Sequence, residues 1–200
     1  MIKDNFLDKA KDWDNNSKVV QNASNIAKLI KENIKLNNSM TIMDFGAGTG
    51  LLSSFISDSV AKIVAVDNSP AMLDKLKSKI SNFDCEIEVL EKDLGIENID
   101  NKFDGIISSM TIHHLKDTTL LFEKFYNMLD DGGFIAIADL DKEDGSFHSD
   151  NCGVFHFGFD RDELREIATK IGFKNIEFKL ANKINKPHNE FSVFLMSASK

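Results

Sequence analysis

The residues best suited to chemistry in this chain are a glycine-rich turn, acids that follow apolar runs, and histidines in the second half. The turn is Asp44-Phe45-Gly46-Ala47-Gly48-Thr49-Gly50, with glycine at alternate positions after an apolar run. Glycine allows positive φ and leaves no side chain between the backbone and a bound molecule. The free N–H groups of a following helix favour an anionic group. This stretch therefore predicts a strand, a tight turn and a helix that together bind a charged ligand.

Four of the five histidines fall into two groups. His113 and His114 follow the apolar run 103–108, whereas His148 and His156 belong to the irregular, aromatic-rich segment 141–159. Long irregular segments of this kind are often functional. Successive residues of an extended segment point to opposite sides, so we expect only one of His113 and His114 to face a given pocket. No HxH or HxxxH spacing occurs, and the sequence predicts no metal site.

Charge and composition exclude several classes of partner. The net charge of −8, with Arg161 and Arg165 as the only arginines, argues against nucleic acid, which binds to clustered basic residues. No apolar run is long enough to span a bilayer, and the first twenty residues do not resemble a secretory signal. Cys85 and Cys152 show no metal-binding spacing and are expected as free thiols. These features predict a cytoplasmic protein whose partner is a small molecule or another protein, and they leave its oligomeric state open.

The apolar spacing predicts strands that alternate with helices. Near-continuous apolar runs suit parallel strands that are covered on both faces. The runs expected as strands are 40–45, 61–66, 85–91, 103–108, 134–140, 175–181 and 190–197. The short link around Pro187 permits only an antiparallel hairpin. We predict an α/β fold with a Rossmann-like, doubly wound seven-stranded sheet, mostly parallel with an antiparallel C-terminal hairpin, and helices on both faces.

Several helix ends are marked by single residues. Ser69 and Pro70 suit an N-cap and a first helical position, and Asp160 with Glu163 forms a second N-terminal signal. Gly172 suits the end of that second helix, and Gly132 and Gly133 are expected to end the preceding one. Two hundred residues suffice for one domain, 1–200, with a helical N-terminal lid or extension at 1–38 and a core at 39–200. Within the extension, Phe6 and Trp13 either fasten the N-terminus or help to close over a ligand.

Five motifs occur together in one order along the chain. They are DFGAGTG at 44–50, VAVDNS at 65–70, EKDL at 91–94, FDGIISSMTIHHL at 103–115 and LDDGGFIAIADL at 129–140. In this combination the chain resembles the class I S-adenosylmethionine (SAM)-dependent methyltransferases, and most of all the small stand-alone enzymes that act on small molecules. The resemblance covers roughly residues 38 to 200.

The resemblance implies a site for SAM and its product, S-adenosylhomocysteine (SAH). In the family, the glycine turn holds the methionine part, an acid in the position of Asp67 accepts the ribose hydroxyls, and an acid in the position of Asp93 binds the adenine amino group. The residues that the resemblance assigns to the cofactor are Asp44, Gly46, Ala47, Gly48, Gly50, Asp67, Asn68, Met72, Asp93, Leu94 and Ser109. The candidates for a catalytic base or an acceptor contact are His113, His114, His148 and His156, with Asp139 as a further acid at the same rim.

The leading prediction is methyl transfer from SAM to a small or medium-sized acceptor, whose identity the sequence leaves open. A protein that binds SAM without catalysis is an alternative, because a fold alone does not imply activity. An NAD-dependent oxidoreductase is disfavoured, since Leu51 occupies the position where GxGxxG requires glycine or alanine. The C-terminal hairpin also disfavours it.

Overall fold

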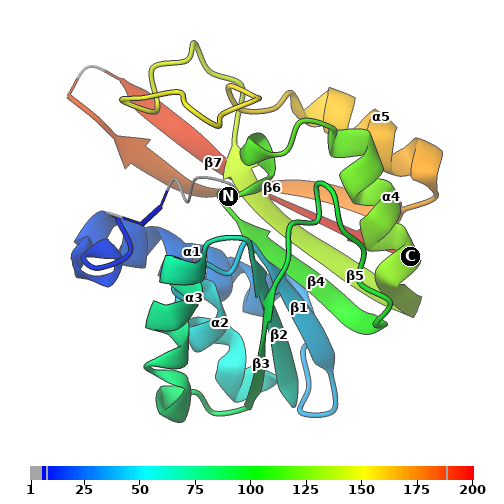
Figure 1. The fold of residues 1–200 in the computed structure, drawn as a ribbon. Coiled ribbons are helices and arrows are strands. Elements are labelled where there is room, and N and C mark those ends of the chain that lie inside the picture. Colours follow the sequence, from blue (N-terminus) through cyan, green and yellow to red (C-terminus); the bar gives the residue numbers. More distant parts are fainter. Residues whose placement is uncertain (1–5, 8, 188) are drawn as a thin grey trace.

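The fold is a seven-stranded sheet with the strand order β3-β2-β1-β4-β5-β7-β6 (Figure 1). This computed structural model describes residues 6–7, 9–187 and 189–200. The strands are β1 Thr41–Phe45, β2 Lys62–Asp67, β3 Glu86–Glu91, β4 Phe103–Ser109, β5 Leu129–Leu140, β6 Lys174–Asn185 and β7 Glu190–Ser199. The first five pair in parallel, and β7 is antiparallel to both β5 and β6. The predicted fold class is confirmed.

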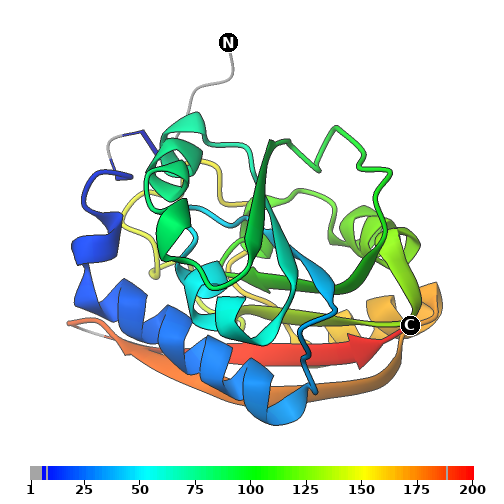
Figure 2. The ribbon, with the colours of Figure 1, turned by 90° about the horizontal axis from the view of Figure 1, so that it is seen from below.

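Helices cover both faces of the sheet. They are α1 Ser17–Asn33, α2 Leu51–Ile56, α3 Pro70–Lys77, α4 Thr118–Met128 and α5 Arg161–Ile171, with the 3-10 helices η1 Trp13–Asn15, η2 Ser57–Ser59, η3 Ile80–Asn82 and η4 Ile112–His114. Ile26 of α1 and Leu52 of α2 belong to one buried cluster, whereas Phe125 of α4 and Leu164 of α5 belong to another. Figure 2 shows α1 lying along the β6–β7 part of the sheet.

The predicted helix-capping residues act as expected at two helices. The side chain of Ser69 accepts a hydrogen bond from the amide of Met72, and Pro70 is the first residue of α3. The side chain of Asp160 accepts from the amides of Asp162 and Glu163, and Gly172 follows α5 in the left-handed conformation. These local signals were sufficient because each cap satisfies N–H groups of the first turn or C=O groups of the last.

Several boundaries differ from the sequence prediction. Helix α4 ends at Met128, and the buried Leu129 already pairs with Phe103, so Gly132 and Gly133 lie inside β5 and do not cap the helix. The register between β4 and β5 shifts at this point, which places the glycines at an irregularity of the ladder. Strand β6 and strand β7 are both longer than predicted. No helix separates β3 from β4 in the described chain.

The strand order places the functional site. The chain builds β1, β2 and β3 outward in one direction and then crosses back to place β4 on the other side of β1. The strand order therefore reverses between the neighbouring strands β1 and β4. Ligands of open α/β sheets bind at the carboxyl ends of the strands beside such a switch point. The segments at this edge are the glycine turn after β1, Asp67 to Ser69 after β2, η4 after β4 and the loop 141–159 after β5.

Candidate functional site

The three glycines of the turn have different reasons to be glycine. All adopt positive φ, at +68° for Gly46, +55° for Gly48 and +79° for Gly50. A Cβ atom on Gly46 would collide with Thr111, and one on Gly50 would lie 2.9 Å from Leu76. A Cβ atom on Gly48 would meet no atom within 4 Å. Gly48 is therefore where the turn exposes backbone to open space, whereas Gly46 and Gly50 permit close packing.

Asp67 is held in place by the backbone beside this open position. One carboxylate oxygen, Oδ2, accepts from the amide of Gly48 at 2.8 Å, and Oδ1 accepts from the amide of Ser69 at 2.8 Å. The residue is only partly buried. A partly exposed carboxylate fixed by two amides can still accept further hydrogen bonds from a ligand, because each oxygen has two lone pairs.

Asp93 and Asn68 lie together at the next strand end. Oδ1 of Asp93 accepts from the amide of Gly95 at 2.8 Å, and the Asn68 amide group approaches Oδ2 of Asp93 at 3.5 Å. Met72 and Leu94 are 3% and 2% exposed, so they form the packed layer beneath. The acids expected to bind the ribose and adenine thus occupy adjacent strand ends.

Asp44, by contrast, is enclosed below the turn. Its carboxyl group is 1% exposed, and Oδ2 accepts from the Ser53 hydroxyl at 2.6 Å. Burial raises the pKa of Asp44 to about 7, against the opposing effect of the hydrogen bond from Ser53. Ala47 is also buried, and its side chain packs in a small cluster with Ala65 and Leu76.

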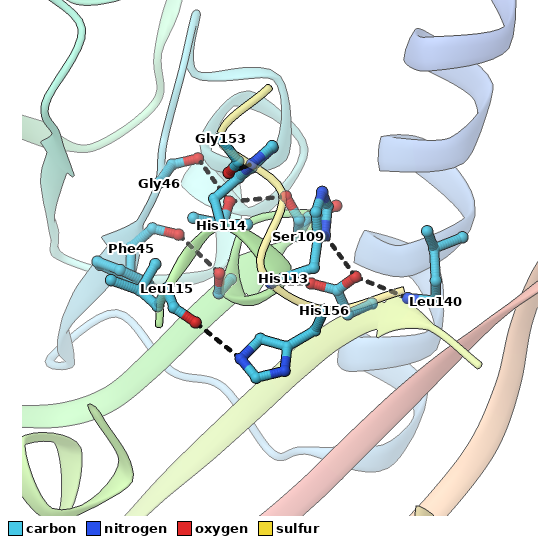
Figure 3. Close-up of polar contacts among 12 residues, drawn as sticks. Phe45, Gly46, Ser109, His113, His114, Leu115, Leu140, Gly153 and His156 are labelled. Atoms are coloured by element: carbon cyan, nitrogen blue, oxygen red, sulfur yellow. Dashed lines mark hydrogen bonds and ion pairs between the residues drawn. The ribbon is translucent and has the colours of Figure 1, made fainter. Parts of the chain in front are cut away.

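The end of β4 is tied to the glycine turn. The hydroxyl of Thr111 lies 3.1 Å from the carbonyl of Ser109 and 3.4 Å from that of Gly46 (Figure 3). Between them, Met110 adopts φ +58°, which is uncommon for a residue with a side chain. Such backbone strain is concentrated at functional sites. Thr111 had no expected role from the sequence, and its place two residues after β4 was the available signal.

The described N-terminal residues contact both parts of this edge. The carboxylate of Asp14 accepts from the Thr49 hydroxyl at 2.5 Å and pairs with Nζ of Lys79 at 2.5 Å. The ring of Phe6 meets the rings of Trp13 and His114 edge-on, at centroid distances of 6.2 Å and 5.7 Å. The segment 6–16 therefore links the glycine turn to the histidines.

His113 forms a buried pair with Asp139. Its Nδ1 lies 2.7 Å from Oδ1 of Asp139, and the two side chains are 1% and 0% exposed. The same Oδ1 accepts from the amide of Leu140 at 2.7 Å, and Oδ2 accepts from the amide of His113 at 3.3 Å (Figure 3). Asp139 therefore faces His113 and the backbone, and it orients the imidazole ring.

His113, His114 and His148 form one cluster of rings. The centroids lie 4.2 Å apart for His113 and His114, 5.0 Å for His113 and His148, and 5.8 Å for His114 and His148. The expectation that His113 and His114 face different sides is wrong, because they lie in the 3-10 helix η4 and not in an extended segment. Burial lowers the pKa of His114, and it lowers the pKa of His148 to about 4.

Two nitrogen atoms of this cluster lack hydrogen-bond partners. Nε2 of His113 and Nε2 of His148 are buried, and no described group bonds to either. A buried polar atom without a partner costs about 1–3 kcal/mol. Among the described residues, no group of three or more His, Cys, Asp or Glu side chains could hold a metal ion. The two Nε2 atoms are therefore suited to a ligand that can form hydrogen bonds with them.

His156 has a different role in the structure. Its Nε2 lies 2.9 Å from the carbonyl of Leu115 (Figure 3). The same atom lies 3.3 Å from the Thr118 hydroxyl, and the ring packs beside Phe159. The amides of Phe155 and His156 both donate to the carbonyl of His113. His156 thus helps to attach the loop 141–159 to η4.

The fold and site together define a protein of the class I methyltransferase type. A model of the methyltransferase domain family matches residues 19–178. The chain therefore belongs to the class I SAM-dependent methyltransferase family, which confirms the family and the cofactor that the motifs predicted. The family match excludes the alternative prediction of an NAD-dependent oxidoreductase.

Individual relatives agree with this assignment. An uncharacterized methyltransferase of Schizosaccharomyces pombe is 31% identical over 60% of the chain and 48% of the relative. Malonyl-[acyl-carrier protein] O-methyltransferase 1 of Ilyobacter polytropus is 30% identical over 68% of the chain and 51% of the relative. The chain thus spans about half the length of these curated relatives.

Solved structures share the fold. A chain from the Haloferax volcanii complex between the Trm112 methyltransferase activator and a methyltransferase has a TM-score of 0.78 at 17% identity, with 100% of this chain and 99% of that chain covered. Haemonchus contortus phosphoethanolamine N-methyltransferase 2, solved with SAM, has a TM-score of 0.73 at 17% identity, with 100% and 60% covered. Among the described residues, no helix is both long and apolar enough to cross a membrane.

Proposed function

We propose that this chain transfers the methyl group of SAM to a small or medium-sized acceptor. The observation that carries the proposal is the Asp67 carboxylate, fixed by the amides of Gly48 and Ser69 beside the one turn glycine that faces open space. This arrangement places open space above the Gly48 backbone next to a carboxylate acceptor, at the ends of the adjacent strands β1 and β2. SAM carries both a carboxylate and a ribose diol.

The cofactor would extend from the glycine turn toward Asp93. Asp67 would accept the ribose hydroxyls, and Asp93 with Asn68 would face the adenine amino group. Gly46, Gly50, Ala47, Met72 and Leu94 would shape the site by packing, and Ser109 through its carbonyl contact to Thr111. Asp44 would order the turn from below through Ser53.

The acceptor would lie toward η4, where His113, His114 and His148 are clustered. Methyl transfer is a displacement at an activated carbon, so alignment and exclusion of water supply much of the catalysis, about 7–11 kcal/mol in well-oriented systems. The segment 6–16 would act as a lid, since Asp14 contacts the glycine turn and Phe6 contacts His114. A cytoplasmic setting stays a prediction that the two free cysteines support.

Titration calorimetry with SAM, SAH and NAD tests the cofactor part of the proposal. We expect SAM and SAH to bind and NAD to give no heat. Transfer of a labelled methyl group from SAM to a library of small acceptors then tests activity. Tight SAM binding without transfer to any acceptor would favour the alternative of a binding protein without catalysis.

A further inference from the structure

The tautomer of the neutral His113 ring is fixed by Asp139. Oδ1 of Asp139 accepts from the Leu140 amide, so it also acts as an acceptor toward Nδ1 of His113 at 2.7 Å. The proton of the neutral ring is therefore on Nδ1, and Nε2 carries a lone pair. This Nε2 atom is buried and has no partner among the described groups.

His114 adopts the same tautomer for a different reason. Its Nδ1 lies 2.7 Å from the carbonyl oxygen of Gly153, which can only accept. Nδ1 of His114 therefore carries the proton, and burial lowers the pKa of the ring, which favours the neutral form. His113 and His114 thus both have Nε2 atoms that accept hydrogen bonds and donate none.

The surroundings supply no guanidinium group for an anion. Arg161 is bound to the carboxylate of Asp141, and Arg165 donates to the carbonyl of Ile176. The positive charges that reach the cluster come from Lys9 and Lys186, which lie over the rings of Phe6 and Phe147 respectively. An anionic acceptor group placed against these two lone pairs would lose hydration without gaining a hydrogen-bond donor from either imidazole ring.

We propose that the methyl acceptor presents a proton-bearing nucleophile, an amine N–H or a hydroxyl O–H, to Nε2 of His113, and that a carboxylate is not accepted there. The inference rests on the proposed function, because it concerns the acceptor side of the same site. His113 is then the catalytic base, and Asp139 is a positioning residue that fixes the tautomer and stabilises the imidazolium.

The proposed step balances without a further reactant. For a hydroxyl acceptor the O–H bond breaks, and for an amine, which arrives as its ammonium ion, one N–H bond of that ion breaks; in both cases the proton moves to Nε2 of His113. The electron pair left on the acceptor atom forms a bond to the methyl carbon of SAM. The bond between that carbon and sulfur breaks, and its electron pair stays on sulfur, which gives neutral SAH and the methylated acceptor.

Aromatic rings lie beside the histidine cluster. Phe147 meets His148 edge-on at 4.8 Å, and Phe6 lies at the His114 side. Aromatic rings pack well against other rings in this arrangement. Benzylamine, benzyl alcohol and benzoate are therefore suitable probes, since they share a ring and differ in the polar group.

The test measures probe binding to the SAH-saturated protein by ¹⁵N NMR of the imidazoles. We expect benzylamine or benzyl alcohol to shift Nε2 of His113 and to bind about tenfold or more tightly than benzoate, the size of one hydrogen bond to a buried partner. The two accepted probes distinguish an amine from a hydroxyl site. His113→Asn keeps a donor for Asp139 but removes Nε2, and it should abolish the preference.

The control is Lys116→Ala, since Lys116 is exposed and lies just after the same 3-10 helix. This variant should keep the preference. Equal or tighter binding of benzoate, no binding of any probe, or an unchanged preference in His113→Asn would overturn the inference. Failure of SAH to bind overturns the proposed function and this inference with it, whereas SAH binding with a reversed preference overturns the inference alone.

Discussion

The two halves of the site differ in how their polar groups are satisfied. On the cofactor side, the carboxylates of Asp67 and Asp93 accept from backbone amides at 2.8 Å. On the acceptor side, the ring nitrogens Nε2 of His113 and His148 are buried without described partners. The cofactor side is therefore set by local backbone geometry, while the acceptor side leaves bonding capacity for another molecule.

This difference has a consequence for mutations. On the cofactor side, Asp67 bonds to the backbone amides of Gly48 and Ser69, at the ends of two strands that pair in the sheet. The acceptor side brings together η4, the end of β5 and the loop 141–159, as the pair of His113 and Asp139 shows. If the comparison holds, substitutions on one side should change cofactor affinity and those on the other should change the rate of transfer.

The largest effect is expected for His113→Asn. Loss of the base should lower the rate of transfer to an amine or hydroxyl acceptor by about 10²–10⁴-fold. The affinity for SAH should stay within about twofold, because the side chain of His113 bonds to Asp139 and to none of the residues assigned to the cofactor. Single-turnover transfer of labelled methyl groups and calorimetry with SAH measure the two quantities separately.

Lys116→Ala is the matched control for that experiment, as an exposed residue of the same segment. It should change neither quantity. A His113→Asn protein that loses SAH affinity as strongly as it loses rate would show that the two halves are not separable.

The next effect concerns Asp44, the one acid of the cofactor side that is enclosed. Burial raises its pKa from 3.8 to about 7, so between these values the folded state keeps a proton that the unfolded chain releases. Its contribution to the free energy of unfolding therefore falls as pH rises through this window and is constant above it. At 1.36 kcal/mol per pKa unit, the loss between pH 5 and pH 8 is roughly 2–3 kcal/mol.

Asp44→Asn removes this titration and can still bond to Ser53. The stability of the variant relative to the original protein should rise by that amount from pH 5 to pH 8. Urea unfolding at four pH values measures it. Parallel stability curves for the two proteins would contradict the enclosed, protonated carboxyl group.

Asp67→Ala tests the cofactor side directly. Removing the carboxylate should weaken SAM binding by about 1–3 kcal/mol, the cost of lost charge-assisted hydrogen bonds. The imidazole ¹⁵N spectrum of His113 should be unchanged, because Asp67 belongs to another strand end. Calorimetry and NMR of one sample provide both readouts. Unchanged SAM affinity would mean that the ribose is held elsewhere.

Only part of the fold could be predicted from the sequence. The strand and helix alternation, the caps at Ser69 and Asp160 and the closing hairpin were predictable, since each depends on neighbouring residues or on simple periodicity. The end of α4 was not, because the pairing of Leu129 with Phe103 outweighed the local glycine signal. Tertiary contacts overrode local propensity at that point.

The site shows the same division. The glycine turn and the acids after β2 and β3 were recognisable as motifs. The pairing of His113 with Asp139 spans 26 positions, and the contact of Asp14 with Thr49 spans 35. No spacing rule encodes such contacts, because they depend on how separate elements meet. The 3-10 turn that brings His113 and His114 to one cluster was likewise invisible to a prediction that assumed extended backbone.

The smallest effect is expected for docking of the loop 141–159 at low pH. The pKa of His148 is lowered to about 4, chiefly by burial and further by the neighbouring His113, His114, Lys186 and Lys9. Below its usual pKa of 6.5, an open loop takes up a proton that the docked loop refuses, so docking weakens as pH falls from 6.5 to 4. The ring is only partly buried, which reduces the effect to about 1 kcal/mol or less.

Hydrogen exchange at the amides of Phe155 and His156, corrected for intrinsic rates, should be faster at pH 5 than at pH 7. His148→Gln should remove part of this dependence and leave the part due to His114, whereas identical pH profiles would show that His148 does not control the loop.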